Sequence, residues 1–141
     1  MGAGEARATF AALSKALTAV QTPIGAGWIL ARDEPELREP PGPPAAARLL
    51  PSGDAYFLHW EAGRELLVPD VTQRAELWTS RVWPGAVLVA GEIVGTWRRA
   101  QAYLSVHPWR RLTRAERDAV EAEARSLPLP VEGQISVQWS G

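Results

Sequence analysis

Two apolar runs, residues 86–89 and 93–98, flank the turn sequence Ala90-Gly91-Glu92. A glycine in a short turn between two such runs is typical of an antiparallel hairpin. Residues 103–107 alternate apolar and polar side chains, which predicts a third strand of the same meander. An antiparallel sheet is therefore the element around which the rest of the chain has to pack.

The most clearly marked helix is expected over residues 113–126. The hydroxyl of Thr113 can accept from the amide of Glu116, while the Glu116 carboxylate reaches back to the amide of Thr113, an arrangement known as a capping box. The apolar stripe of this helix consists of Val120, Ala124 and Leu127. Three pairs of opposite charge are spaced four residues apart on it: Arg114–Asp118, Arg117–Glu121 and Glu121–Arg125.

A proline-rich run, Pro40-Pro41-Gly42-Pro43-Pro44, divides the chain. Proline fixes φ and has no amide hydrogen, so this run forms neither a helix nor a central strand. Before it we expect a helix at 4–17, strands at 18–22 and 28–31, and a short helix at 33–37 with Asp33 as its N-cap. The predicted boundaries are 1–38 for the first part, 39–46 for the connector and 47–141 for the second part.

Four further elements are expected in the second part. They are a strand at 48–51, a strand or short helix at 56–60, a helix at 71–78 capped by Asp70, and a closing strand at 135–139.

Composition narrows the possible functions. The 141 residues suffice for one domain or for one small domain with an appendage, and the formal net charge of −1 contrasts with the basic charge usual in free-standing DNA-binding domains. The absence of cysteine excludes disulfides and thiolate metal sites. The spacing of His59 and His107 does not suggest a metal site, so no metal and no cofactor are expected. No apolar run is long enough to span a membrane and no signal peptide is evident, which predicts a cytoplasmic protein.

Six sequence features follow one another in a familiar order. They are Leu49-Leu50-Pro51, Asp54, Pro69-Asp70, the turn at 90–92, Val94-Gly95-Thr96-Trp97-Arg98 and Leu112-Thr113-Arg114-Ala115-Glu116-Arg117. Together they resemble the C-terminal part of the bacterial winged-helix DNA-binding-domain family related to crosslink-repair DNA glycosylases. The resemblance is strongest over residues 47–127, with a weaker match back to the Phe10 helix and forward to Trp139.

The resemblance implies a recognition-type helix at 4–17, a wing hairpin at 18–31, and a C-terminal β-barrel-like region with its helix at 47–139. We therefore expect an α+β fold: a small β-barrel-like, antiparallel sheet with a capping helix, preceded by a partial winged-helix unit. The family's hairpin turn usually resembles Asp-Gly, whereas Ala90 precedes Gly91 here, which leaves the turn type open.

The resemblance also bears on catalysis. The catalytic glutamine motif of the family lies near the N-terminus of the full-length proteins, and this chain is expected to begin after it. Neither Gln134 nor Gln138 matches the position of that motif. Base-excision activity is therefore not expected from this chain alone.

Basic side chains are the candidate contacts to duplex DNA: Arg7, Lys15, Arg98, Arg99, Arg110 and Arg111. Trp97 either stacks on a base or lies in the core. Strand alternation favours the core for Trp97 and the outer surface for Arg98. Arg114 and Arg117 have expected partners on their own helix and are poorer candidates.

Asp54 is the best isolated carboxylate for a polar site, because it follows an apolar strand and a glycine turn. The alternative is that its side chain closes an Asx-turn or caps the next element. We favour this alternative because aspartate so often serves in turns.

Two hypotheses remain open. The first is a DNA-binding module, forming the C-terminal portion of a glycosylase-like protein, that binds duplex DNA weakly and in a salt-sensitive manner. The second is a structural domain without a nucleic-acid role of its own, which self-associates or docks on a partner protein. Its contact surface would be the apolar helix face of Phe10, Leu13 and Leu17.

Overall fold

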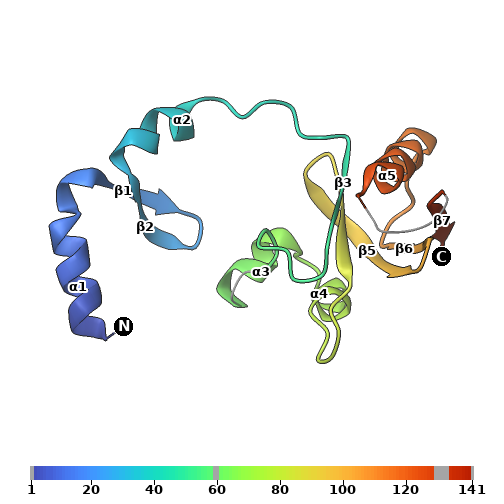
Figure 1. Cartoon of the computed structure of the whole chain (residues 1–141), viewed down its shortest axis with the longest axis horizontal. Helices are drawn as coiled ribbons and strands as arrows, with labels where there is room; N and C mark the ends of the chain where they lie inside the picture. The colour runs from blue at the N-terminus through green and yellow to red at the C-terminus, as the bar shows by residue number, and fades with distance from the viewer. Residues whose placement is uncertain (1, 59–60, 129–133, 141) are drawn as a thin grey trace. The chain divides into compact units, whose positions relative to one another are not determined.

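The computed structural model describes residues 2–58, 61–128 and 134–140. The chain divides into two compact units, Met1–Gly42 and Pro43–Gly141, which are described separately (Figure 1). Helices and strands occur in both units, so the architecture is α+β, as expected from the sequence.

The first unit consists of a helix, a hairpin and a second short helix. Its elements are α1 (Ala3–Ala12), a 3-10 turn (Ser14–Ala16), β1 (Leu17–Thr22), β2 (Gly25–Leu30), a second 3-10 turn (Ala31–Asp33) and α2 (Glu34–Arg38). The strands β1 and β2 pair antiparallel, and the hydroxyl of Thr22 closes their turn by donating to the Gly25 carbonyl over 2.6 Å. Asp33 occupies the N-cap position of α2 without making a side-chain cap bond, in contrast to the role expected of it.

The first helix is shorter than the sequence predicts. The expected helix at 4–17 ends at Ala12, and Leu17 is instead the first residue of β1, where it pairs with Leu30. β-Branched residues follow Leu17 at alternating positions, and such residues fit a strand better than a helix. Phe10, Leu13 and Leu17 therefore do not form one helix face, which corrects the contact surface predicted above.

The second unit is built on a five-stranded sheet. Its strands are β3 (Ala47–Leu50), β4 (Gly85–Val89), β5 (Glu92–Ala100), β6 (Tyr103–Pro108) and β7 (Ser136–Trp139), paired in this order. Over the described residues β3 and β7 are the two edges, so the sheet is open where we expected a barrel-like one. The first three pairings are antiparallel, but β6 and β7 are parallel. A helix connects them, as parallel neighbours require a long crossover.

The turn between β4 and β5 has a defined type. Val89 pairs with Glu92, so Ala90 and Gly91 form a two-residue loop. Their φ angles are 51° and 88°, and two positive values identify a type I′ turn. Alanine thus adopts a left-handed conformation that glycine, asparagine or aspartate tolerates better.

Three helices cover the sheet of the second unit: α3 (Glu61–Leu67), α4 (Val71–Leu77) and α5 (Arg114–Ser126). Figure 1 shows α5 on one side of the sheet and α3 with α4 on the other. Asp70 caps α4 as predicted, since its Oδ1 accepts from the amides of Thr72 and Gln73 over 2.8 and 3.0 Å. The capping box of Thr113 and Glu116 also forms as predicted.

Each face of the sheet has its own core. The core under α5 contains Leu49, Val87, Val89, Val94, Trp97, Leu104, Val106, Leu112, Val120 and Ala124. The core under α3 and α4 contains Phe57, Val68, Leu77, Ala86 and Leu88. Trp97 is 9% exposed, which confirms its expected place in the core. The segment expected as a strand or short helix at 56–60 forms turns through Phe57, and its last two residues lie outside the described ranges.

Candidate nucleic-acid interface

The end of β5 presents two guanidinium groups to solvent. Trp97 faces the core under α5, and the next residue, Arg98, is exposed, as strand alternation requires. The Nη2 of Arg98 donates to the Val82 carbonyl over 2.9 Å. The Nη1 of Arg99 donates to the carbonyl of Gln101 in the following turn over 3.4 Å. Both cations are held by backbone carbonyls and keep their charge facing water.

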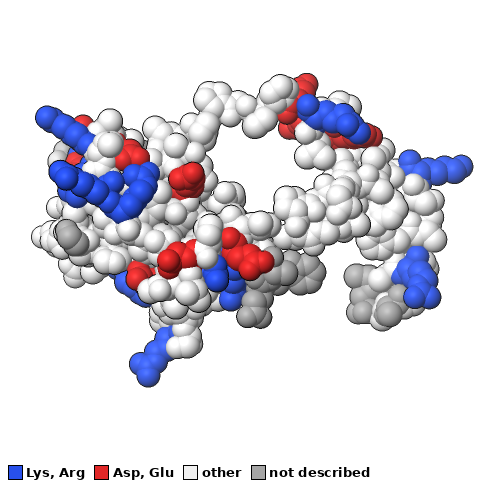
Figure 2. Space-filling model, turned by 180° about the vertical axis from the view of Figure 1, so that it is seen from behind, with Lys and Arg blue, Asp and Glu red and all other residues white. Residues whose placement is uncertain are grey.

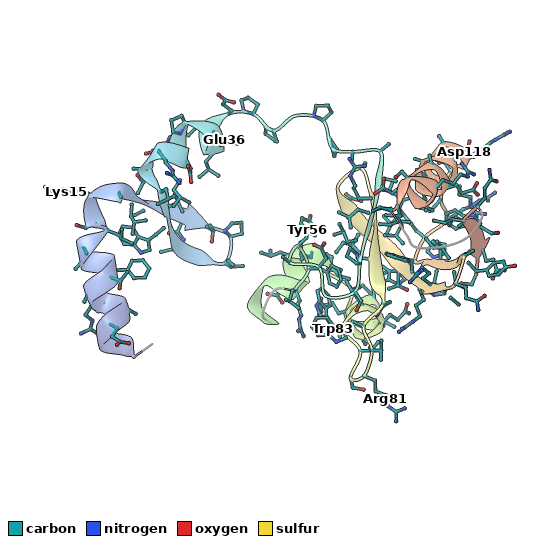
Figure 3. The ribbon with its side chains drawn as sticks, viewed as in Figure 1. Lys15, Glu36, Tyr56, Arg81, Trp83 and Asp118 are labelled. Carbon is teal, nitrogen blue, oxygen red and sulfur yellow. The ribbon has the colours of Figure 1, made fainter. Side chains whose placement is uncertain are left out.

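The loop between α4 and β4 lies beside Arg98 and was not identified from the sequence. Three hydrogen bonds stabilise it: Thr79 Oγ1 to the Val82 carbonyl (3.0 Å), Trp83 Nε1 to the Thr79 carbonyl (2.7 Å), and the bond from Arg98. Figure 3 shows Arg81 at the outer end of this loop, pointing away from the rest of the unit. We refer to Arg81 and Val82 as the loop tip.

A second basic cluster follows β6. A surface hollow of about 420 Å³ is lined by Pro108, Trp109, Arg110, Arg111 and Arg117. On the face seen in Figure 2, basic side chains gather over the α5 end of the second unit, with acidic side chains beside them. The guanidinium of Arg117 lies 4.9 Å from the ring centre of Trp139, and Glu121, its expected partner, pairs instead with Arg125 over 2.9 Å.

Arg110 is tied to a carboxylate. Its Nη2 and Nη1 donate to the two carboxylate oxygens of Glu116 over 2.7 and 3.2 Å. This contact, together with the amide of Thr113, lowers the pKa of Glu116 from 4.5 to about 2. The same carboxylate raises the pKa of Arg110. Because its charge is already compensated, Arg110 is a weaker candidate for a phosphate contact than Arg111.

The two clusters lie toward opposite ends of β5. Arg98 pairs with Ser105, whereas the amide of Trp109, the residue before Arg110, donates to the Val94 carbonyl over 2.8 Å. Arg98 lies four positions after Val94, which corresponds to roughly 13 Å along a strand. The sheet thus separates the four predicted arginines of this unit into two pairs.

The remaining predicted contacts lie in the first unit. Arg7 is exposed on α1, and Lys15 is exposed on the 3-10 turn that follows it (Figure 3). The end of α1 at Ala12 therefore places these two cations on different elements, where we had expected one helix.

Asp54 has a local structural contact. Its Oδ1 accepts from the amide of Tyr56 over 2.9 Å, and its carbonyl accepts from the amides of Phe57 and Leu58. This is the Asx-turn that we favoured for this residue, and it accounts for its side chain without a ligand.

Neither a metal site nor a membrane-spanning helix is found in the described ranges. There, no three His, Cys, Asp or Glu side chains are grouped so that they could hold a metal ion. His107 lies 3.7 Å from Glu76, which also accepts from Trp109 Nε1 over 2.8 Å, and His59 falls outside the described residues. No described helix has both the length and the apolar character needed to cross a membrane.

Comparison with known proteins identifies the family. Residues 1–128 match the family model described as DNA glycosylase AlkZ-like, so the chain belongs to this family of DNA glycosylases and the predicted family is confirmed. The solved structure of the Streptomyces sahachiroi DNA glycosylase AlkZ is similar to it, with a TM-score of 0.70 and 22% sequence identity. That similarity covers 99% of this chain but only 38% of the AlkZ chain. Among curated proteins, no match was found.

Proposed function

We propose that this chain is a DNA-binding module of a glycosylase-related protein and does not excise bases on its own. Membership of a DNA glycosylase family is the observation that carries the proposal. Exposed cations at the end of β5 and after β6 support it, because contacts to DNA phosphates come mainly from such groups. We assign Arg98, Arg99 and Arg111 as the phosphate contacts of the second unit, with Arg110 as a weaker contributor.

The affinity should be low and sensitive to salt. The net charge of −1 provides no general attraction to DNA, so binding depends on local clusters. Since only a few phosphates are neutralised, the logarithm of the binding constant should fall with the logarithm of the salt concentration with a shallow slope.

For the first unit we propose a partial winged-helix arrangement over residues 1–38, joined by a connector at 39–46 to the module at 47–141. A helix followed by a two-stranded hairpin is consistent with a recognition helix and its wing. In this arrangement Arg7 would reach DNA from the helix and Lys15 from the turn between helix and wing.

The non-catalytic part of the proposal rests on the two glutamines near the C-terminus. Gln138 is exposed in β7 and pairs in register with Ser105, and Gln134 lies just before that strand. Neither position corresponds to the catalytic motif that the family carries near its N-terminus. A base-excision assay on alkylated duplex DNA tests this point: release of the damaged base by the 141-residue chain would contradict it.

Fluorescence anisotropy with a labelled duplex at low salt tests DNA binding. We expect weak binding that R98A and R99A together reduce, and that R111A reduces independently. Arg114→Ala is the matched control, because Arg114 is exposed on α5 outside both clusters and its 3.9 Å pairing with Asp118 is loose. Absence of binding by the wild-type chain at high micromolar concentration would refute the proposal for this chain.

A second function is favoured by one specific observation. No residue of the first unit whose burial is described is buried, and several large apolar side chains are exposed there: Phe10, Leu13, Ile24, Trp28 and Leu37. Exposed apolar groups of this kind often mark protein interfaces. In this alternative the chain self-associates or docks on a partner protein, and light scattering that shows a strict monomer would argue against self-association.

A further inference from the structure

We propose that the loop tip, Arg81 and Val82, is a wedge that probes DNA for disturbed base stacking. In this role Val82 packs against an opened base step and Arg81 holds the adjacent phosphate. The inference rests on the proposed DNA-binding function and adds to it a recognition element that none of the residues predicted from the sequence supplies.

The exposure of Val82 is the first observation. Its side chain is 69% exposed, and the neighbouring Trp83 is half-buried against the core under α3 and α4. A single exposed aliphatic side chain is ordinary on a protein surface. It becomes informative here because of how the loop presents it.

The loop holds its tip in a fixed conformation. The Val82 carbonyl accepts two hydrogen bonds, one from the Thr79 hydroxyl at 3.0 Å and one from Arg98 at 2.9 Å. The indole of Trp83, the residue after the loop tip, donates a hydrogen bond to the Thr79 carbonyl on the other side of the tip. The Arg64 guanidinium lies 5.8 Å from the centre of the Trp83 ring. Because these contacts use the backbone and the flanking side chains, Val82 cannot fold back to bury itself without breaking them.

Charge next to the apolar group points to nucleic acid as the partner. Arg81 lies at the outer end of the loop (Figure 3), and Arg98 is hydrogen-bonded to the Val82 carbonyl. An aliphatic side chain inserted at a base step, with cations on the phosphates beside it, is a common means of reading the deformability of DNA. Protein partners would be expected to use a larger apolar area than one valine.

The surroundings leave the tip accessible. Glu76, the carboxylate of α4, accepts a hydrogen bond from Trp109 Nε1 and lies 3.7 Å from His107. Among the described residues no ion pair of Arg81 is found, so its charge is available to a phosphate.

The test compares two valines of equal exposure. Val82 and Val71 are both 69% exposed, but Val71 lies at the start of α4, away from the tip. The probes are two duplexes labelled with 2-aminopurine, one fully paired and one with a single-base bulge beside the label. Anisotropy reports affinity, and 2-aminopurine fluorescence reports local unstacking.

We expect the wild-type chain to prefer the bulged duplex and to change its 2-aminopurine signal. V82A should bind the bulged duplex roughly tenfold more weakly, as expected for losing two buried methyl groups, and should lose the signal change. V71A should behave as wild type. R81A should weaken binding to both duplexes and lower the salt slope by about one. Circular dichroism should show that each variant retains the native fold.

Two results would overturn the inference in distinguishable ways. If the wild-type chain binds DNA and V82A retains both the preference and the signal, the tip is not a wedge, while the DNA-binding function stands. If the wild-type chain binds neither duplex, the proposed function itself fails, and the wedge fails with it.

Discussion

The indole Nε1 of Trp97 donates a 2.8 Å hydrogen bond to the backbone carbonyl of Leu50. This bond links β5 to the edge strand β3 across the intervening strand β4. The indole crosses β4 at Gly85, where an added Cβ would lie 2.5 Å from the Leu50 oxygen and would also collide with the ring. Glycine is needed at this position because of that close approach and not because of its φ angle.

Gly85→Ala should therefore lower the free energy of unfolding by about 2–3 kcal/mol, the usual cost of overpacking a core. Urea denaturation followed by tryptophan fluorescence would measure this effect. Gly42→Ala is the control, because nothing lies within 4 Å of a Cβ placed there. Equal stability of the two variants would show that the indole can move aside without cost.

Ala90 should gain stability from a residue that accepts a positive φ. Ala90→Asn or Ala90→Gly should raise the free energy of unfolding by about 0.5–1 kcal/mol, because the type I′ turn places alanine at φ 51°. Gly91→Ala, at φ 88°, should have the opposite effect. Thermal denaturation of the three variants checks the signs. A destabilising Ala90→Asn would mean that this turn is not type I′ in solution.

Asp70 should contribute to stability through its cap on α4. Asp70→Ala removes the acceptor of the Thr72 and Gln73 amides and should cost about 1 kcal/mol. Asp70→Ser keeps an acceptor in the same place and should recover most of the loss. If serine and alanine destabilise the chain equally in urea, the side-chain cap is not the source of the effect.

Glu116 should make the stability of the chain depend on acid pH. Its folded pKa of about 2 lies below the ordinary value of 4.5. Its contribution to the free energy of unfolding is therefore complete above pH 4.5 and is lost as the pH falls through about 2. In urea denaturation, the stability difference between wild type and Glu116→Gln should shrink as the pH falls through this window.

A nuclear magnetic resonance titration of the Glu116 carboxyl identifies the cause. Arg110→Ala should raise its pKa toward the ordinary value, because the two hydrogen bonds from the guanidinium are lost. Arg111→Ala removes a neighbouring charge without those bonds and serves as the control. An unchanged pKa in Arg110→Ala would assign the shift to the amide of Thr113 alone.

Local signals in the sequence were sufficient for the elements that depend on local contacts. The helix from Thr113 carries its own capping box, and the Asp70 cap lies within three residues of both its donors. The place of Trp97 followed from strand alternation. In the two caps the interacting groups are close in sequence, and strand alternation is itself a local pattern, so the sequence alone was sufficient in all three cases.

The failures concern contacts between distant residues. The end of α1 at Ala12 depends on the pairing of Leu17 with Leu30, which the helical spacing of Phe10 and Leu13 does not reveal. The parallel pairing of β6 with β7 depends on the path of α5, and an alternating strand pattern reads the same in either direction.

The contacts around the candidate site were the least predictable from the sequence. The loop tip gains its rigidity from Arg98, a residue 16 positions further along the chain. The pairing of Arg110 with Glu116 was not predicted, because Arg110 lies outside the helix and its spacing from Glu116 falls beyond the usual helical pairs. A guanidinium and its partner are found together only once the fold is known.

Strand β4 is buried along its whole length, with Ala86 and Leu88 in one core and Val87 and Val89 in the other. In evolutionary terms this burial should leave β4 little freedom to change. No side chain of β4 faces only water. Each substitution must therefore fit one of the two separately packed cores. Divergent members of the family should therefore exchange residues of similar volume here, while β6 and β7, with alternate side chains in solvent, can vary in polarity.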